Sequence, residues 1–412
     1  MSRFVSRTQK GQRMKSRNLR LAGDARRACS RLPLVMLPML TLHCTETLPG
    51  ITGTQSLKVE LVAPANPGTE AQRLGDSQRE LRVKVTALDE QGQIDGAFNN
   101  EVAVHVQFLA TLTPALGQLP LSTIKLTNGV APETTVRLPP VFGPTTLWIE
   151  DSRGDNASYA TGTTPTLWYR DPFISDFQTP SDENALSAFS TSPLETKQLR
   201  VTGSRYGERG RLVVTSVFAQ GYTVSDVQCA DAAANPPCTS QGYDHALIFS
   251  FSRPRDINGR AVELGQVITG FTGGVVEFNG LTELSFPQTF ADATPSVDVR
   301  RIPAPLKVEA AWFTSQKINF EKNEAALISV EGAKMCPLDA DFERYKQWKL
   351  ALDGNCSNRS GLVNVISTGL LFDPAIHVNK TMGKVVGVLK PVNIAAFNVW
   401  IIYPRDDSDI AP

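Results

Sequence analysis

Hydrophobic and polar residues alternate along much of the chain between residues 56 and 170. Leu81, Val83 and Val85 are separated by charged residues, which places one face of a predicted strand on a core. Runs of the same kind occur at 57–61, 102–108, 136–138 and 147–149. Turn sequences such as Asn128-Gly129 separate the runs. About seven short strands in about 115 residues predict a β-sandwich over residues 45–171.

The second half of the chain contains the same order of strands twice, in residues 199–297 and 303–412. Each unit has a long strand, a loop between two cysteines, a further strand and a Gly-led closing run that ends in Pro. The corresponding segments are the strands 211–226 and 325–331, the loops 229–238 and 336–356, the strands 246–252 and 361–366, and the closing runs 265–287 and 383–404. In both units the Cys pair is expected directly after the first long strand. This shared position indicates a duplication. Residues 172–198 are polar and rich in Ser, Thr and Pro, and are expected to be a linker.

Two family resemblances turn these patterns into a fold prediction. The run from Val83 to Asp89, followed by Gly92, resembles the bacterial immunoglobulin-like (Ig-like) domains of surface proteins, and residues 145–151 resemble their closing strands. The strand order of the two later units resembles the small barrel called the OB-fold, in the form attached to secreted bacterial nucleases. In the first unit this likeness is carried by Gly265, Val267, Gly270, Phe278, Asn279, Gly280, Thr282 and Leu284. The resemblances imply an all-β chain, with an N-terminal Ig-like β-sandwich followed by two OB-like small β-barrels.

The N-terminus has the pattern of an export signal. Residues 1–44 carry ten basic residues and one acidic residue, and residues 32–42 read LPLVMLPMLTL, without a charge. A helix that spans a bilayer needs about twenty apolar residues. The shorter run behind a basic flank therefore predicts a secretory signal peptide. Either Met1 or Met14 is the start, and Met14 would give a signal of more usual length.

The segment Leu40 to Cys44 resembles the lipobox of bacterial lipoproteins. Leu40 and Cys44 fit the pattern, whereas His43 replaces the small residue that usually precedes the Cys. The resemblance implies that Cys44 becomes the first mature residue and carries the lipid that anchors the protein to a bilayer. Thr45 follows the Cys, whereas lipoproteins that some bacteria retain in the inner membrane have an Asp at this position. The resemblance therefore favours the outer membrane, with the protein facing the periplasm or the surface. The alternative is an ordinary signal peptide with an incidental Cys.

Four further cysteines lie beyond the signal: Cys229, Cys238, Cys336 and Cys356. An even number in an exported chain predicts disulfides, because export leads to oxidising compartments. The local spacing predicts the pairs Cys229–Cys238 and Cys336–Cys356, each worth about 2–4 kcal/mol of stability. Four free buried thiols are the alternative. The chain has no CxxC and few His residues, so neither a metal site nor a cofactor is predicted.

The charge distribution disfavours nucleic acid as the partner. The whole chain has 41 basic and 41 acidic residues, so 31 basic and 40 acidic residues remain beyond residue 44. Nucleic-acid binding depends on cations that neutralise phosphates, and an acidic body supplies few of them. The exception is a group of arginines in the first OB-like unit, namely Arg200, Arg205, Arg209, Arg211, Arg253, Arg255 and Arg260.

Part of this group, with neighbouring aromatic residues, forms the candidate ligand surface. OB-folds bind single strands through a basic groove and exposed aromatic rings. The surface consists of Arg205, Arg209, Arg211, Phe218, Tyr222, Arg253 and Arg255, and further rings that could join a stacking platform are Phe249, Phe251, Tyr345 and Trp348. The alternative is that these arginines are ordinary surface residues on hairpins.

No sequence motif predicts catalysis. The chain has no GxSxG elbow, HExxH, phosphate loop or dinucleotide-binding glycine pattern. Asp244 and His245 are adjacent, so on a strand they would face opposite sides, and a surface turn is expected there. Arg153-Gly154-Asp155 is expected to be a hairpin tip. The acidic cluster Asp406, Asp407 and Asp409 is expected to be a solvated tail rather than a calcium site.

These observations predict an exported, lipid-anchored, non-catalytic envelope protein. It would bind a protein or polymer, or act as a structural spacer. The first alternative is an OB-fold protein that binds nucleic acid at the cell surface. The second is an enzyme whose active site is assembled from residues far apart in the sequence. Fold resemblance alone does not choose among these functions.

Overall fold

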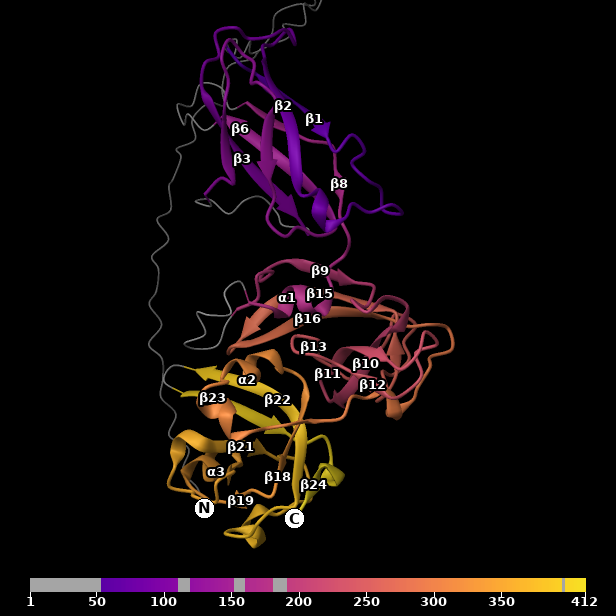
Figure 1. Cartoon of the computed structure of the whole chain (residues 1–412), viewed down its shortest axis with the longest axis vertical. Coiled ribbons are helices and arrows are strands. Elements are labelled where there is room, and N and C mark those ends of the chain that lie inside the picture. Colours follow the sequence, from indigo (N-terminus) through magenta and orange to yellow (C-terminus); the bar gives the residue numbers. More distant parts are fainter. Residues whose placement is uncertain (1–52, 110–118, 152–159, 181–190, 395–396) are drawn as a thin grey trace, which may run out of the picture. The chain divides into compact units, whose positions relative to one another are not determined.

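The computed structural model describes residues 53–109, 119–151, 160–180, 191–394 and 397–412 (Figure 1). These residues are mainly β-strands arranged in four sheets, so the prediction of an all-β chain is confirmed. The predicted signal peptide with Cys44, and the Arg153-Gly154-Asp155 tripeptide, lie outside the described residues. Within the described ranges, no helix is long and apolar enough to cross a membrane.

The N-terminal region contains two antiparallel sheets. One has the order β1-β2-β5, and the other has the order β4-β3-β6-β7 with β8 paired to β6. The strands of the first sheet are β1 (Ser56–Ala63), β2 (Glu80–Leu88) and β5 (Thr134–Arg137). Those of the second are β3 (Glu101–Phe108), β4 (Ser122–Lys125), β6 (Pro144–Asp151), β7 (Thr161–Thr163) and β8 (Leu167–Trp168). A short helical turn, η1 (Asp76–Gln78), precedes β2.

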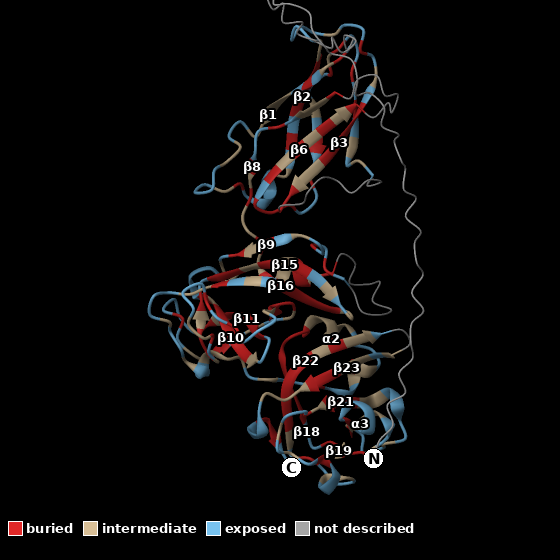
Figure 2. Cartoon of the chain, turned by 180° about the vertical axis from the view of Figure 1, so that it is seen from behind, coloured by how far each residue is buried: buried red, intermediate tan, exposed pale blue. Residues whose placement is uncertain are grey.

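The predicted alternation is present in both of these sheets. In β2, Leu81, Val83 and Val85 are fully buried, and the charged residues between them are exposed. Strand β6 alternates between buried and half-buried residues in the same way (Figure 2). Leu81, Leu147 and Ile149 belong to one hydrophobic core. Burial of apolar area at about 25 cal/mol per Å² is the main force that fixes this register.

Part of the predicted linker is packed rather than extended. Helix α1 (Ile174–Gln178) lies within residues 172–198, and its Ile174 and Phe177 are fully buried. The Gln178 side chain donates from Nε2 to the carbonyl oxygen of His245 at 2.5 Å. This segment therefore contributes to the hydrophobic core. Large apolar residues such as Phe177 are unusual in a linker, and their burial is the reason that the segment packs.

The first eight-stranded sheet follows in the order β14-β10-β11-β13-β16-β15-β9, with β12 paired to β11. Strands β13 and β16 are parallel, and the other neighbours are antiparallel. Strand β14 pairs with β10, and β15 begins two residues after β14 ends, so the chain itself links β14, at one end of the order, to β15, the second strand from the other end. The bounds are β9 (Gln198–Val201), β10 (Gly210–Phe218), β11 (Gly221–Cys229), β12 (Cys238–Thr239), β13 (His245–Phe249), β14 (Val267–Ile268), β15 (Gly270–Phe278) and β16 (Leu281–Phe290), with the turns η2 (Gly207–Arg209) and η3 (Val299–Arg301).

The second eight-stranded sheet has the order β17-β18-β22-β23-β21-β20-β19, with β24 paired to β22. Strands β21 and β23 are parallel, as are β17 and β18. Strands β18 and β19 are consecutive along the chain and pair with β22 and β20, so the chain itself links β19, at one end of the order, to β18, the second strand from the other end. The strands are β17 (Leu306–Lys307), β18 (Leu327–Glu331), β19 (Lys334–Met335), β20 (Gln347–Ala351), β21 (Leu362–Ile366), β22 (Lys384–Ile394), β23 (Phe397–Tyr403) and β24 (Ile410–Ala411). The helices and turns are η4 (Ala310–Phe313), α2 (Ile318–Lys322), α3 (Ala340–Tyr345), η5 (Arg359–Gly361), η6 (Pro374–His377) and η7 (Asp407–Asp409).

Both predicted disulfides are present, but they do not occupy equivalent positions. Cys229–Cys238 joins the end of β11 to β12. Cys336–Cys356 joins the residue after β19 to the loop after β20, so α3 and β20 lie inside its loop. The expectation of a shared position for the Cys pair is therefore wrong. A separation of 20 residues leaves room for a helix and a strand, whereas a separation of 9 residues does not.

Candidate ligand-binding site

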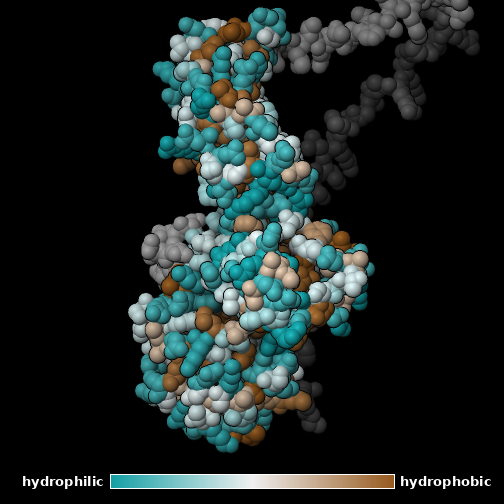
Figure 3. Space-filling view, turned by 45° about the vertical axis from the view of Figure 1, so that its right-hand side comes forward, coloured by the Kyte–Doolittle hydropathy of each residue, from teal (hydrophilic) through white to brown (hydrophobic). Residues whose placement is uncertain are grey.

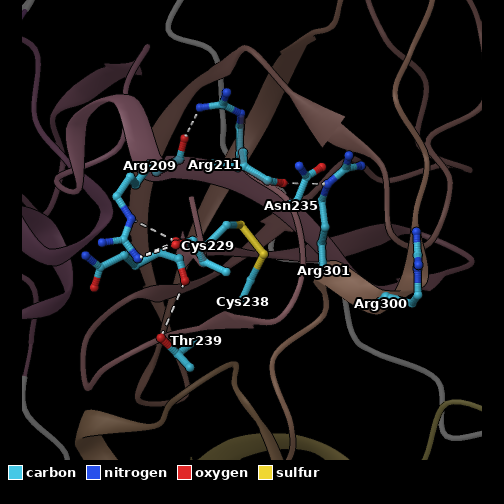
Figure 4. Close-up of a disulfide and its surroundings, with 12 residues drawn as sticks. Arg209, Arg211, Cys229, Asn235, Cys238, Thr239, Arg300 and Arg301 are labelled. Carbon is cyan, nitrogen blue, oxygen red and sulfur yellow. Dashed lines mark hydrogen bonds between the residues drawn. A yellow bond between two sulfur atoms is a disulfide. The ribbon is translucent and has the colours of Figure 1, made fainter. Parts of the chain in front are cut away.

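Arg209 and Arg211, two members of the predicted ligand surface, hold the backbone beside the first disulfide. Arg209 donates from Nε and Nη2 to the carbonyl oxygen of Cys229 at 3.0 and 2.9 Å. Arg211 donates from Nη1 to the carbonyl oxygen of Glu208 at 2.9 Å. Figure 4 shows the Arg209 guanidinium beside Cys229, whereas the Arg211 side chain points away from the Cys229–Cys238 bridge. Both guanidinium groups are thus used to satisfy backbone carbonyls, which is a structural role.

Arg205 is part of a buried polar network. Its Nε lies 2.8 Å from Oδ1 of Asp244, and its backbone N–H donates to Oδ2 of Asp226 at 2.8 Å. The Tyr206 hydroxyl donates to Oδ2 of Asp244 at 2.6 Å. Asp226 and Asp244 are both fully buried. Burial raises the pKa of both carboxyl groups, that of Asp226 to about 7. Arg205 therefore compensates buried acids, which leaves it poorly placed for a ligand.

The remaining predicted residues do not form one surface either. Arg255 donates to the carbonyl oxygen of Gly259 at 2.6 Å, while Arg253 is exposed. Tyr222 is fully buried, and its hydroxyl lies 2.7 Å from Oγ1 of Thr289. Phe218 is half-buried beneath the ammonium group of a lysine from β22, 4.4 Å from the ring centroid. The prediction that Tyr222 is available to a ligand is wrong because its side chain points into the core.

Three phenylalanines of the first eight-stranded sheet do form an exposed cluster. The ring centroids of Phe249 and Phe251 are 4.6 Å apart, and those of Phe251 and Phe286 are 4.8 Å apart. Phe251 is 51% exposed and Phe286 is 78% exposed. Elsewhere, on the face in Figure 3, hydrophobic residues stand in small groups between hydrophilic ones. Of the other proposed stacking rings, Trp348 is buried and Tyr345 is exposed.

A buried serine–histidine pair is present, but its acid–base properties do not suit catalysis. Ser225 Oγ lies 2.7 Å from Nδ1 of His245. Burial lowers the pKa of His245 to about 3, with the nearby Arg205 guanidinium adding to the effect. A general base works best with a pKa near the operating pH, so this imidazole is a poor one. The expected surface turn at Asp244-His245 is wrong, since both side chains are buried.

The acidic cluster near the C-terminus is tied into the fold. Asp409 accepts hydrogen bonds from Nε and Nη2 of Arg405 at 2.9 and 2.7 Å. Asp407 Oδ1 accepts from the backbone N–H groups of Leu371 and Phe372 at 2.8 and 3.0 Å. The expectation of a solvated tail is therefore wrong for Asp409, which is buried, whereas Asp407 is exposed but bonded to the segment at Leu371 and Phe372. Among the residues that the structure describes, no group of three or more His, Cys, Asp or Glu side chains is placed to hold a metal ion.

The second eight-stranded sheet carries a cavity of about 390 Å³, which we call the aromatic cleft. Its apolar lining consists of Trp312, Phe313, Phe320, Ile328, Leu362, Val363, Leu389, Val399, Trp400 and Ile402. Its polar lining consists of Lys317, Glu321, Arg359, Ser360, Asn364 and Asn398. The lining comes mainly from the segment that contains η4 and α2 and from strands β21 and β23. This volume is within the usual range for small-ligand sites, about 300–1,000 Å³.

Phe320 is the centre of the aromatic wall. Its ring centroid lies 5.3 Å from that of Trp312 and 5.2 Å from that of Phe313, both edge-to-face. Trp400 stacks on it at 5.7 Å with an interplanar angle of 16°. Trp312 and Phe320 are buried, whereas Phe313 and Trp400 are partly exposed. Such ring pairs add about 0.5–1.5 kcal/mol each beyond their buried area, so the wall is preformed.

The cleft was not predicted from the sequence. Its aromatic residues are spread over residues 312–400, and no spacing among them indicates a common site. The adjacent pair Trp312-Phe313 was the available signal, because two large rings in a polar segment require a packing partner. The partner, Trp400 on β23, is identified only by the pairing of strands.

Comparisons with known proteins do not identify the chain. No protein-family model matches it, and no curated protein matches it. Among solved structures, it is similar to the crystal structure of dimeric latent PorU from Porphyromonas gingivalis, with 10% identity and a TM-score of 0.21. The match covers 85% of this chain and 34% of that chain, so this chain spans about a third of PorU's length. At this TM-score the likeness identifies neither fold nor function.

Proposed function

We propose that the chain is an exported, lipid-anchored, non-catalytic protein that binds a protein or polymer at the bacterial envelope. A basic flank and a short apolar run before Cys44 support export and lipidation. Two disulfides support an oxidising compartment, since cytosolic thiols are kept reduced. The outer membrane is the proposed site of the anchor.

We further propose that the N-terminal region is an Ig-like sandwich and that the two eight-stranded sheets are OB-like barrels. The sandwich is supported by the sheet orders β1-β2-β5 and β7-β6-β3-β4. The barrels are supported by a strand order that recurs in both units. In the first unit β13 pairs in parallel with β16, and in the second β21 pairs in parallel with β23. In each unit two consecutive strands, β14 with β15 and β18 with β19, lie at or next to opposite ends of the order, as expected where a five-stranded barrel closes.

The single observation that carries the binding function is the aromatic cleft. A cleft with preformed aromatic walls and polar residues at its rim has the composition of a binding site. The structural-spacer alternative predicts no ligand in the cleft.

The test is photo-crosslinking in cells at the rim of the cleft. A photo-reactive phenylalanine replaces Ser360, which lines the cleft and is exposed. The control places it at Tyr345, which is 58% exposed and does not line the cleft. We expect a discrete adduct from position 360 and none from position 345. Equal adducts at both positions, or none at either, would contradict binding at the cleft.

The exposed Phe251–Phe286 pair favours a second candidate, a single-stranded nucleic acid on the first barrel. Aromatic stacking contributes about 1–3 kcal/mol per base, and Arg253 is exposed two residues after Phe251. The test is a gel shift of the full chain with single-stranded DNA at low salt, beside a Phe251→Ala/Phe286→Ala variant. Binding that falls steeply with salt and is lost in the variant would support this function. We expect no shift, because the mature chain is acidic.

A further inference from the structure

The floor of the aromatic cleft determines which part of a ligand enters it. Ile328, Leu389 and Ile402 form this floor and are themselves buried core residues. A sugar ring or a phosphate placed there would lose its hydrogen bonds to water without gaining others, which would lower its affinity. The entering group is therefore apolar.

The size of the cleft limits that group to about one side chain. A cavity of about 390 Å³ is at the small end of ligand sites and does not enclose a continuous polymer. The rings of Phe313 and Trp400 line the cleft and are both partly exposed. A phenyl side chain fits against such rings by edge-to-face or offset contact, and a branched aliphatic side chain fits by apolar contact.

The rim supplies two cations that are not used by the fold. Lys317 and Arg359 both line the cleft and are exposed, and neither has an ion pair within the described residues. By contrast, Lys349 of the same sheet pairs with Asp339 and Asp341 at 2.6 and 2.5 Å. An available guanidinium and ammonium beside an apolar cavity are suited to a carboxylate, which a guanidinium can bind through two parallel hydrogen bonds.

The acids near the rim do not cancel this preference. Glu321 is the one acidic residue in the described lining. Asp353 lies in an adjoining hollow that shares Phe313 and Ser360 with the cleft. Its carboxylate already accepts hydrogen bonds from the backbone of Asn355 and from a neighbouring amide side chain, at 2.8 and 3.2 Å. Two cations thus face one acid at the rim itself.

We propose that the aromatic cleft binds the C-terminal residue of a peptide chain, with a hydrophobic side chain in the cavity and its carboxylate on Arg359 and Lys317. This inference rests on the proposed binding function and names its ligand class. Asn398 and Ser360, both exposed at the rim, can hydrogen-bond the preceding peptide group. A fatty acid offers the same carboxylate and an apolar chain, but it has no amide for these two residues.

The experiment uses the intrinsic fluorescence of the full chain, because Trp312 and Trp400 line the cleft. The probes are N-acetyl-L-phenylalanine, its C-terminal amide and octanoate. We expect the acid to change the fluorescence saturably and the amide to bind about tenfold more weakly, because its uncharged terminus makes no charge-assisted contact with Arg359 and Lys317. Octanoate should bind more weakly than the acid. A Trp400→Phe variant should lose most of the signal.

Rim variants test which residues recognise the carboxylate. Arg359→Gln/Lys317→Gln should bind the acid and the amide equally, and Arg344→Gln, an exposed substitution outside the cleft, should behave as the wild type. Circular dichroism verifies that each variant is folded. Equal affinity for acid and amide in the wild type, or tighter binding of octanoate, would overturn the proposal. So would the absence of any saturable change. These fluorescence results test only the ligand class. The crosslinking experiment at position 360 tests the proposed binding function independently of them.

Discussion

The backbone N–H of Arg205 donates a 2.8 Å hydrogen bond to one carboxylate oxygen of Asp226, and the other oxygen of that carboxylate is buried without a hydrogen-bond partner among the described residues. An ionised carboxylate in this position is only half solvated by the protein. Burial accordingly raises the pKa of Asp226 to about 7. The protonated form is thus stabilised by folding, which couples stability to pH.

Asp226→Asn should change the dependence of stability on pH. The folded pKa of Asp226, about 7, is above the unfolded value of about 3.9. Its contribution to stability is therefore fully present below about pH 4 and is lost as the pH rises to about 7. Asn is neutral throughout and can still accept from Arg205, so the variant should be more stable than the wild type at pH 8 by about 1–3 kcal/mol. Urea unfolding at pH 5 and pH 8 measures this.

Asp292→Asn is the matched control, because Asp292 is exposed in the same sheet region. The Asp292→Asn variant should show the same difference in the free energy of unfolding between pH 5 and pH 8 as the wild type. If Asp226→Asn were equally destabilising at both pH values, the carboxylate would instead be ionised and paired in the folded protein.

Phe286 should be a site where glycine stabilises more than alanine. Its φ is +55°, a left-handed conformation that costs a non-glycine residue about 1–2 kcal/mol. Its ring is 78% exposed, so truncation removes little burial. Phe286→Gly and Phe286→Ala both delete the ring, and only glycine also removes the conformational cost. We expect the Gly variant to be more stable than the Ala variant by about 1 kcal/mol in thermal unfolding. The reverse order would show that the backbone relaxes in the Ala variant.

The second disulfide should contribute more stability than the first because it closes a longer loop. Its separation is 20 residues, against 9 residues for Cys229–Cys238. Chain entropy gives about 3 kcal/mol for such loops, with the longer loop a few tenths higher. Cys336→Ala/Cys356→Ala should lower the free energy of unfolding by about this amount. Cys229→Ala/Cys238→Ala is the comparison, and non-reduced peptide mass spectrometry verifies that the remaining bridge is intact. No loss in either variant would contradict a stabilising role.

Lipidation of Cys44 is a prediction that concerns the segment outside the described residues. Labelling of cells with a palmitate analogue should mark the wild type, and Cys44→Ser should remove the mark and release the protein from the membrane fraction. Cys29→Ser is the control, since Cys29 precedes the apolar run. An unlabelled wild type would favour the ordinary signal peptide.

The sequence alone determined the elements that depend on local pattern. The alternation of Leu81, Val83 and Val85 with charged residues predicted a half-buried strand, because side chains of a strand point to opposite faces in turn. The local spacing of the four cysteines predicted both disulfides. The strands predicted at 246–252 and 361–366 correspond to β13 and β21. By contrast, the strand predicted at 211–226 is two strands, β10 and β11, and β20 lies inside the predicted loop 336–356.

Only the tertiary structure decided which side chains are available to a ligand. Strict alternation would place Phe286 on the same face as the fully buried Leu284, but a register shift opposite Gly273 leaves Phe286 exposed. Tyr222 is buried in the core, and Arg205 pairs with a buried acid, Asp244. The sequence carries no local signal for either contact. The aromatic cleft unites Trp312 with Trp400. Their distance is set by how the sheet curves and pairs, a property of long-range contacts rather than of neighbouring residues.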